Sequence, residues 1–385
     1  MTEFFSTFAN FFAEVFGNVG NLNWKMVVMW VIGGILIYLA IKKEMEPALL
    51  LPIGFGAILV NLPMSGAITQ LIEGESEVGV LSFLYDKGIA NELFPLILFV
   101  GIGAMIDFAP LLSNPKLMLF GAAAQFGIFF TLSMASLFGF ELKDAASIAI
   151  IGAADGPTSI FVANFFKSNY IGPIIVAAYS YMALVPIIQP PVIKLITTRK
   201  ERLIRMKFQQ KEISKTVRIL FPIIITAVTG LVAPRAVALV GFLMFGNLIR
   251  ECGVLGSLSE SAQKELANLV TLFLGITIAA KMQADSFLNS KTLLIMGLGL
   301  VAFIFDTVGG VLFAKLYNVF AKNKINPMIG AAGISAFPMS ARVVHKIGLE
   351  EDNQNFLLMH SIGVNVSGQI ASVIAGGMIL NLIAR

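Results

Sequence analysis

One stretch places a carboxylate and two helix breakers inside a strongly apolar segment: Gly152-Ala153-Ala154-Asp155-Gly156-Pro157-Thr158-Ser159. A carboxylate at the centre of a lipid bilayer costs about 3 kcal/mol or more, so it is rarely found there without a partner. Gly156 and Pro157 interrupt a helix beside Asp155 and leave backbone groups unpaired. In lipid, such a break is tolerated only inside the protein or beside a wet cavity. An acid next to a broken helix is typical of cation sites in transporters, so the stretch predicts such a site.

The composition indicates an integral membrane protein. The chain has 385 residues, of which 57% are hydrophobic and 13% are charged, whereas soluble domains carry about 25% charged residues. The alternating stretches of about ten residues that are typical of transmembrane barrels are absent, so the spans are predicted to be helices. With one cysteine, Cys252, and two histidines, the chain has no means to build a disulfide framework, and a zinc or haem enzyme is not expected.

A basic connection divides the chain into two halves. Between Lys194 and Arg218 there are nine Lys or Arg residues against two Glu residues. The positive-inside rule therefore places this connection in the cytoplasm, and the protein is expected in the cell inner membrane with many spans. Because the basic run lies between two apolar spans, nucleic-acid binding is not expected.

The two halves contain similar motifs in the same order. Ile151-Gly152-Ala153-Ala154 recurs as Ile329-Gly330-Ala331-Ala332, and each copy leads into a helix-breaking stretch. Further pairs are Asn61 with Asn247, Gly101 with Gly275, Asn114 with Asn289 and Lys116 with Lys291. The order of these matches predicts a duplicated unit. If each unit crosses the membrane an odd number of times, the two halves are inverted relative to each other.

The predicted fold is an all-α polytopic membrane protein with two inverted-topology repeats, whose broken or re-entrant helices meet near mid-membrane. We expect four parts: an amphipathic helix over 1–20, a first membrane repeat over 21–196, a basic cytoplasmic linker over 197–216 and a second membrane repeat over 217–385. The helix over 1–20 is inferred from phenylalanines at helical spacing. It is expected to lie at the membrane interface, against a partner subunit or in the core.

The second broken stretch carries oxygen ligands that suit Na⁺. It runs from Asn326 through Pro327 and Gly330 to Ser335. Asn and Ser oxygens, with carbonyl groups freed at Gly and Pro positions, are hard ligands of the kind that such a cation needs in number. Small residues also serve close helix packing in membranes, and we favour that role for the glycines alone. Asn326 and Ser335 are predicted to act as ligands opposite Asp155.

Other polar residues stand inside or beside apolar spans. Tyr181 lies near the centre of the span after the acid, and Asn365 has the corresponding place in the second half. Arg342 is expected either to hold a carboxylate or a bicarbonate-like anion by two hydrogen bonds, or to reach the cytoplasmic interface. Lys281 is a candidate counter-ion or proton donor. Asp306 is a further charge within or at the edge of a span.

Three motifs together resemble one family: Gly152-Ala153-Ala154-Asp155-Gly156-Pro157-Thr158-Ser159, Gly246-Asn247-Leu248-Ile249-Arg250-Glu251-Cys252-Gly253, and Asn326-Pro327-Met328-Ile329-Gly330-Ala331-Ala332 with the following Pro338-Met339-Ser340-Ala341-Arg342. The family is the β subunit of the biotin-dependent, sodium-translocating decarboxylases, which includes the oxaloacetate, methylmalonyl-CoA and glutaconyl-CoA enzymes. The resemblance covers nearly the whole chain from about Trp24 onward.

This resemblance implies a sodium pump subunit. It would receive carboxybiotin from a biotin carrier subunit on the cytoplasmic side, release CO₂ with consumption of a proton, and drive Na⁺ outward. The implied cofactors are Na⁺ and carboxybiotin, the latter presented by the carrier and not covalently bound here. The implied partners are the carrier, a carboxyltransferase α subunit, a small membrane γ or δ subunit and the lipid bilayer, and a homo-oligomer is compatible with this arrangement.

The resemblance also implies a set of site residues. Residues that the family uses match Asp155, Tyr181, Asn326, Gly330, Ser335 and Arg342, and Asn365 lies in a further family motif. All except Arg342 are expected around Na⁺, with Asp155, Tyr181 and Arg342 in the catalytic role and Arg342 and Lys281 as contacts of the carboxybiotin. Oxaloacetate-type members have Gly-Pro-Asn where this chain has Gly363-Val364-Asn365, which favours the acyl-CoA branches.

A stand-alone secondary transporter is the alternative, either a sodium/proton exchanger or a sodium-coupled anion symporter with the same repeats. The chain has no Gly-x-x-x-x-Gly-Lys-Ser/Thr loop, so ATP is not the expected energy source. The two hypotheses differ in the associated proteins that they predict, because a pump subunit should copurify with a biotinylated protein.

Overall fold

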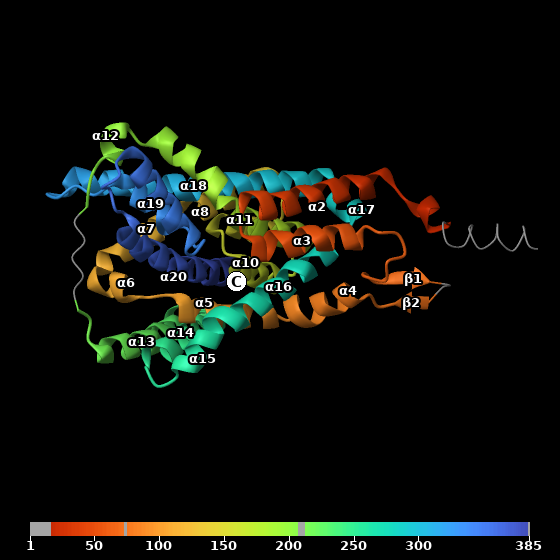
Figure 1. Cartoon of the computed structure of the whole chain (residues 1–385), viewed down its shortest axis with the longest axis horizontal. Coiled ribbons are helices and arrows are strands. Elements are labelled where there is room, and N and C mark those ends of the chain that lie inside the picture. Colours follow the sequence, from red (N-terminus) through yellow and green to blue (C-terminus); the bar gives the residue numbers. More distant parts are fainter. Residues whose placement is uncertain (1–16, 73–74, 207–211, 384–385) are drawn as a thin grey trace, which may run out of the picture. The chain divides into compact units, whose positions relative to one another are not determined.

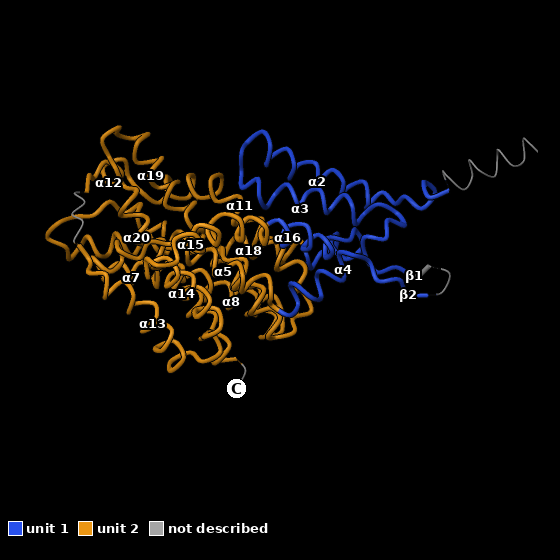
Figure 2. Tube along the Cα trace, turned by 60° about the horizontal axis from the view of Figure 1, so that its bottom comes forward, with its two compact units in different colours: residues 1–91, 272–292 blue, residues 92–271, 293–385 orange. Residues whose placement is uncertain are grey.

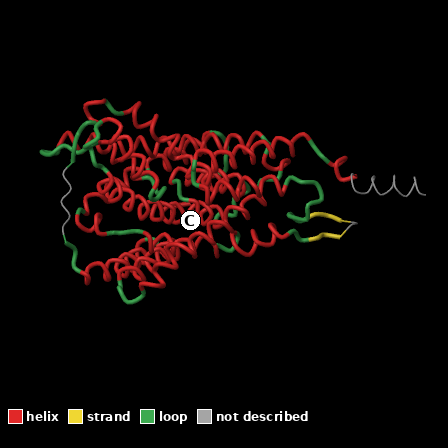
Figure 3. Tube along the Cα trace, viewed as in Figure 1, coloured by secondary structure: helices red, strands yellow, loops and turns green. Residues whose placement is uncertain are grey.

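The computed structural model describes residues 17–72, 75–206 and 212–383, and nearly all of its regular structure is helical (Figure 1, Figure 3). In this part of the chain six helices are long and apolar enough to cross a membrane, or seven if the bent pair Val80–Ile89 and Leu93–Met105 forms one span. The prediction of a helical polytopic membrane protein is confirmed. The helix predicted over 1–20 falls outside the described residues except for its end, where a 3₁₀ turn, η1 (Asn18–Asn21), is present.

The chain forms two compact units, which Figure 2 colours separately. Unit 1 lies within residues 1–91 and 272–292. Its elements are α2 (Trp24–Lys43), α3 (Pro47–Val60), β1 (Gln70–Ile72), β2 (Glu75–Glu77), α4 (Val80–Leu84), the π-helical turn η2 (Tyr85–Ile89), the 3₁₀ turn η7 (Ala279–Lys281) and α17 (Ala284–Phe287). The two strands pair antiparallel in a small hairpin, with Gln70 opposite Glu77. α16 (Ala267–Ile278) and α18 (Ser290–Phe320) contain the boundaries between the units.

Unit 1 is built on close helix packing and one asparagine. α2 and α3 approach so closely that a Cβ added to Gly33 or Gly54 would lie 2.6 Å or 2.7 Å from the other's carbonyl oxygen. Asn61 ends α3, and its amide donates to the carbonyls of Ala57 and Met282, at 2.8 Å each. Its Oδ1 accepts the N–H of Ala284 at 2.7 Å. The side chain therefore satisfies the backbone groups that are left free where the chain breaks after η7.

Unit 2 takes residues 92–271 and 293–385. Its elements are α5 (Leu93–Met105), α6 (Ala109–Ser113), η3 (Pro115–Leu117), α7 (Met118–Ala124), α8 (Phe126–Leu137), α9 (Leu142–Ala149), η4 (Ile150–Ala153), α10 (Gly156–Phe165), α11 (Ile171–Ile196), α12 (Arg199–Arg202), α13 (Lys215–Val232), η5 (Pro234–Ala236), α14 (Val237–Glu251), α15 (Gly256–Ser261), η6 (Ala262–Leu266), η8 (Pro327–Gly333), α19 (Met339–Glu351) and α20 (Leu358–Ile383).

Both predicted helix breaks are present in unit 2. The first is the 3₁₀ turn η4 between α9 and α10, and the second is the 3₁₀ turn η8, which is followed by non-helical residues 334–338 before α19. α20 is largely buried and packs against η8, α7 and α10. A second asparagine, Asn247 on α14, is buried and donates its amide to the carbonyl of Ile106 at 3.0 Å, where α5 ends. In each unit, one buried asparagine thus binds the backbone at a point where a helix is interrupted.

Candidate cation-binding site

Asp155 stands at the point where the first broken helix resumes. Ala154, with a φ of 51°, ends η4 in the left-handed region, and Asp155 then takes the N-cap position of α10. Its side chain accepts the N–H of Thr158 at 3.4 Å and the Thr158 hydroxyl at 2.7 Å. A carboxylate in this position is favoured because the free N–H groups of the helix point towards it. The sequence places Gly156 and Pro157 directly after the cap, where proline suits the first turn of a helix.

A second helix completes the surroundings of the carboxylate. From α20, the amide of Gln369 and the hydroxyl of Ser372 each donate to Asp155 Oδ2 at 3.2 Å. Asp155 is only 3% exposed, and within the described part of the chain no Lys or Arg forms an ion pair with it. The hydroxyl groups of Thr158 and Ser372 can also accept, so each can rotate and present its oxygen to a cation bound at Oδ2. The buried acid is therefore hydrogen-bonded but has no protein cation to neutralise it.

The two breaks meet beside this carboxylate. The N–H of Ser335, just after η8, donates to the carbonyl of Ala153 in η4 at 3.0 Å. The Ser335 hydroxyl donates to the carbonyl of Gly368 at 3.1 Å, and the amide of Asn365 donates to the carbonyl of Ile334 at 2.7 Å. Asn365 Oδ1 is buried and has no hydrogen-bond donor among the described residues. The structure thus brings Ser335 and Asn365 into one buried polar region with Asp155.

The tyrosine next to the acid is Tyr179. Its ring lies so close to Gly156 that a Cβ added there would be 2.5 Å from the ring's Cε atoms, and its buried hydroxyl has no partner in the described part of the chain. Tyr181, the predicted residue, instead donates to the carbonyl of Met296 on α18 at 2.5 Å. Residues two apart on a helix face different directions, and nothing in the sequence decides which of the two faces the break. Reasoning from sequence also missed Gln369 and Ser372.

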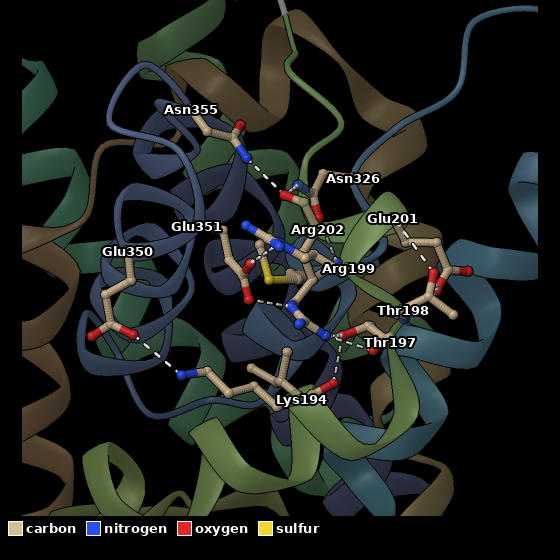
Figure 4. A network of polar contacts seen from close by, with 12 residues as sticks. Lys194, Thr197, Thr198, Arg199, Glu201, Arg202, Asn326, Glu350, Glu351 and Asn355 are labelled. Carbon is tan, nitrogen blue, oxygen red and sulfur yellow. Dashed lines mark hydrogen bonds and ion pairs between the residues drawn. The ribbon is translucent and has the colours of Figure 1, made fainter.

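Asn326 and Gly330 lie on η8 in other surroundings. The Asn326 amide donates to the carbonyls of Arg202 at 2.8 Å and Ile204 at 3.0 Å, and its Oδ1 accepts the N–H of Met328 at 3.1 Å (Figure 4). Gly330 packs backbone to backbone against Gly310 of α18, an approach that leaves no room for a side chain. Asn326 therefore caps η8 and binds the start of the linker, and these hydrogen bonds do not bring it to Asp155.

The predicted cofactor contacts are accessible cations. Arg342 lies in the first turn of α19, is exposed, and has no side-chain hydrogen bond or ion pair with any residue that the structure describes. Lys281 belongs to unit 1, where its ammonium lies 4.3 Å from the ring centroid of Tyr85. Their roles towards carboxybiotin stay predictions.

The first part of the predicted linker is folded and is held by hydrogen bonds and ion pairs to neighbouring segments, as Figure 4 shows. Arg202 donates to Glu351 Oε1 and to the carbonyl of Thr197, both at 2.6 Å. Asn355 donates to the same Arg202 carbonyl that Asn326 binds, at 2.8 Å. We call this set of contacts among 197–206, Asn326, the end of α19 and the turn after it the linker clasp. It joins the linker to the start of η8, the second broken helix.

The donor set suits an alkali cation. Among the described residues, no three His, Cys, Asp or Glu side chains gather as a metal cluster would require. Around Asp155 the polar atoms are instead one carboxylate, hydroxyls, amides and backbone carbonyls. Hard oxygen donors of this kind suit a hard cation better than a transition metal. Fold and site together define a multi-pass helical membrane protein with a buried, hydrogen-bonded carboxylate among hard oxygen donors.

Comparison with known proteins places the chain more narrowly. The family model for the Na⁺-transporting oxaloacetate decarboxylase beta subunit matches residues 25–383. The chain is 48% identical to the methylmalonyl-CoA decarboxylase subunit beta of Propionigenium modestum, with 94% of this chain and 96% of the relative covered. It is 45% identical to the oxaloacetate decarboxylase beta chain of Klebsiella pneumoniae over the same shares. It is 48% identical to the glutaconyl-CoA decarboxylase subunit beta of Acidaminococcus fermentans, over 94% of each chain.

The chain belongs to the family of Na⁺-transporting decarboxylase beta subunits. The resemblance inferred from the three sequence motifs is thereby confirmed, and the stand-alone transporter is not favoured.

Proposed function

We propose that this chain is the membrane subunit of a sodium pump that decarboxylates carboxybiotin and couples CO₂ release and proton consumption to Na⁺ export. The observation that carries the proposal is Asp155, a buried carboxylate with four hydrogen-bonded contacts and no protein cation in the described chain. A charge in that position needs a neutralising partner. Na⁺ and H⁺, bound in turn, supply one.

The sodium site is proposed around Asp155 Oδ2. Ser335 belongs to it because its N–H joins the two breaks. Asn365 belongs to it because it binds Ile334, just after the second break, and its Oδ1 is an oxygen without a donor among the described residues. We add Thr158, whose hydroxyl donates to the acid, and Tyr179, whose ring lies against Gly156 and whose hydroxyl has no partner among the described residues. The family resemblance keeps three further residues in the proposed set: Asn326, Gly330 and Tyr181. The contacts of Asn326 and Gly330 support a role in positioning η8, and the contact of Tyr181 supports a role in positioning α11.

The proposed energetics follow from charge. Moving one charge against 100 mV costs about 2.3 kcal/mol, so Na⁺ export needs a chemical source. Carboxybiotin supplies it by losing CO₂. Arg342 is proposed to hold the anionic carboxyl group, since its exposed guanidinium has no described partner and offers paired donors. Lys281 is proposed as a second cation towards that group. Asp155 releases Na⁺ outward and takes up a proton, so that the site is neutral in both states.

We also propose that residues 21–196 and 217–385 are inverted repeats. Asn61 of the first half binds the break after η7 of the second half, and Asn247 of the second half binds the break after α5 of the first. Lys116 and Lys291 correspond in sequence, so inversion would place them on opposite faces of the membrane.

The proposed setting is the cytoplasmic membrane, with the linker 197–216 inside the cell. The proposed partners are a biotin carrier subunit, a carboxyltransferase α subunit and a small membrane subunit. The linker clasp lies at the end of α18 where Lys315 pairs with Glu201 at 3.1 Å. Val364, in place of the proline of oxaloacetate-type members, favours an acyl-CoA substrate for the whole complex.

The experiment that tests the function is purification of the native complex followed by detection of biotin in the associated subunits. We expect a biotinylated carrier to copurify, and avidin to block both decarboxylation and Na⁺ uptake into inside-out vesicles. Sodium transport by the chain alone, unaffected by avidin, would contradict the proposal and restore the stand-alone transporter.

A further inference from the structure

A second acid is buried beside the first broken helix. Asp306 lies on α18 and is 1% exposed. Its Oδ1 accepts the N–H of Ile128, in the first turn of α8, at 3.1 Å. The α7–α8 span is interrupted at Gln125, and the N–H of Ile128 also donates to the Gln125 carbonyl at 3.2 Å. One carboxyl oxygen of Asp306 therefore caps α8.

The other oxygen of Asp306 has no hydrogen-bond partner among the described residues. It faces η4, because a Cβ added to Gly152 would lie 2.8 Å from Oδ2 and 2.8 Å from the Cβ of Ala302. Gly152 is three residues before Asp155 in the same break. The unpartnered oxygen is thus in contact with the segment that carries the proposed sodium site.

No opposite charge faces Asp306 from the described elements packed against it. α7, α8 and η4 contain no titratable side chain. On α18, Lys315 pairs with Glu201, and on α11, Tyr181 lies against Gly299, about two turns along α18 from Asp306. The next acid along η4 is Asp155. Neutralisation of Asp306 must therefore come from a bound species.

Another buried acid shows what a structural role looks like. Asp144 is 5% exposed, and both of its oxygens are occupied: Oδ1 accepts from Ser168 at 2.6 Å and from the N–H of Asn169, and Oδ2 accepts from the Asn169 amide at 3.3 Å. A cap on α8 needs only one acceptor oxygen, which an amide would provide without a charge. Capping of α8 therefore does not explain why residue 306 carries an ionisable carboxyl group.

We propose that Asp306 is a proton-binding site, separate from the sodium site at Asp155. A proton needs only the free Oδ2. Na⁺ needs several oxygens, whereas Gly152, which Oδ2 faces, has no side-chain oxygen. On binding, the proton forms an O–H bond at Oδ2; on release, the bonding electrons stay on the carboxylate. The proposal rests on the proposed function in one respect, since the pump's reaction consumes a proton for which Asp306 offers a site.

Carbodiimide labelling of the intact complex tests the proposal without turnover. These reagents add to protonated carboxyl groups in apolar surroundings, and peptide mass spectrometry separates Asp306 from Asp155. At Na⁺ about tenfold above its dissociation constant, mass action leaves about one site in ten free, so labelling of Asp155 should fall about tenfold. Labelling of Asp306 should change less than about twofold, because it binds no Na⁺. Failure to label Asp306 where Asp155 is labelled, or equal protection of both by Na⁺, would overturn the proposal.

Paired variants separate proton binding from capping. Asp306→Asn keeps Oδ1 as an acceptor for α8 but binds no proton, and Asp144→Asn is the matched control. In the purified complex, Asp306→Asn should lose one protonated-carboxyl band from the pH-difference infrared spectrum and shift the pH profile of decarboxylation at saturating Na⁺. Asp144→Asn should keep both.

A wild-type spectrum and pH profile in Asp306→Asn would reduce the residue to a cap and overturn the proposal. If Asp306→Asn does not assemble, Asp306→Glu takes its place, because it retains the carboxyl group and should be labelled by the carbodiimide at position 306. Absence of labelling at that position in Asp306→Glu would count against the proposal. A wild-type complex without biotin-dependent decarboxylation would refute the proposed function instead, while the labelling and infrared results would still decide the role of Asp306.

Discussion

Asp155 binds three side chains that donate to its carboxyl group without cancelling its charge. Thr158 comes from its own helix, and Gln369 and Ser372 come from α20. Neutral donors lower the cost of burying a carboxylate, but an isolated ion in an apolar interior still needs a counter-charge. This balance suits a site that must take and release a cation, since a resident Lys or Arg would hold the acid permanently.

The two tyrosines of α11 give a test at the level of single hydroxyl groups. Tyr179→Phe removes a buried hydroxyl without a described partner and should reduce apparent Na⁺ affinity about tenfold, as expected for losing one ligand worth about 1.4 kcal/mol. Tyr181→Phe removes the bond to Met296 and should cost about 1 kcal/mol of stability. The sodium dependence of decarboxylation and the melting temperature of each complex check this. A larger loss of Na⁺ affinity in Tyr181→Phe would return the ligand role to Tyr181.

The site residues show which local signals can be read from sequence. Asp155 was predictable because an acid next to Gly156 and Pro157 in an apolar run is too costly to bury without a partner. Asn326 was predicted as a ligand from its amide oxygen, yet Asn before proline is also a common start of a helix, and the structure shows that role. Gln369 and Ser372 were beyond reach because their contact with Asp155 joins positions more than 200 residues apart.

At the scale of elements, η8 is held by the close approach of two glycines. Gly330→Ala would place a Cβ against the Gly310 carbonyl of α18, and such overpacking costs about 1–3 kcal/mol. We expect a lower melting temperature of the complex and weaker Na⁺ binding. Gly297→Ala, on α18 with open space around it, is the matched control and should melt close to the wild type. Equal stability of the two variants would show that η8 is not fixed by this contact.

The linker clasp gives a prediction that depends on pH. Arg205 donates to Asp352 at 2.6 Å and holds the pKa of that carboxyl below its usual range. A lowered pKa in the folded state means that the contact stabilises the clasp above the pKa of the unfolded chain. That stabilisation is lost as the pH falls through the folded value. Protease cleavage within 197–206 should therefore become faster in acid.

Arg205→Gln should show this faster cleavage already at neutral pH. Lys264→Gln, which removes a surface pair with Glu260 elsewhere, should leave the cleavage rate unchanged. Cleavage of Arg205→Gln at the wild-type rate across the pH range would mean that the ion pair contributes nothing to the clasp.

At the scale of the whole molecule, inverted repeats make a prediction about sidedness. Lys116 and Lys291 correspond in sequence, so inversion places them on opposite faces of the membrane. In a Cys252→Ser background, Lys116→Cys should react with an impermeant thiol reagent from the cytoplasmic side, and Lys291→Cys should react from the outside. Labelling of both from one side would exclude inversion while leaving the cation site intact.

The proposed duplication rests on the sequence, in which each half has its own break and its own asparagine. What sequence could not show is that each asparagine acts on the other half, with Asn61 binding the break at Met282 and Asn247 the break at Ile106. Such contacts depend on the packing of distant segments, which no local pattern records. The helical membrane class followed from composition alone, whereas the division into two compact units did not.

Asp155 is the group on which the proposed binding of Na⁺ depends. Equilibrium binding of radioactive sodium to the purified complex, wild type against Asp155→Asn, measures this directly. The amide keeps the size of the side chain and removes its charge. We predict that the variant complex assembles, loses saturable Na⁺ binding and loses sodium-dependent decarboxylation with it. Saturable binding of wild-type affinity in Asp155→Asn would contradict this role.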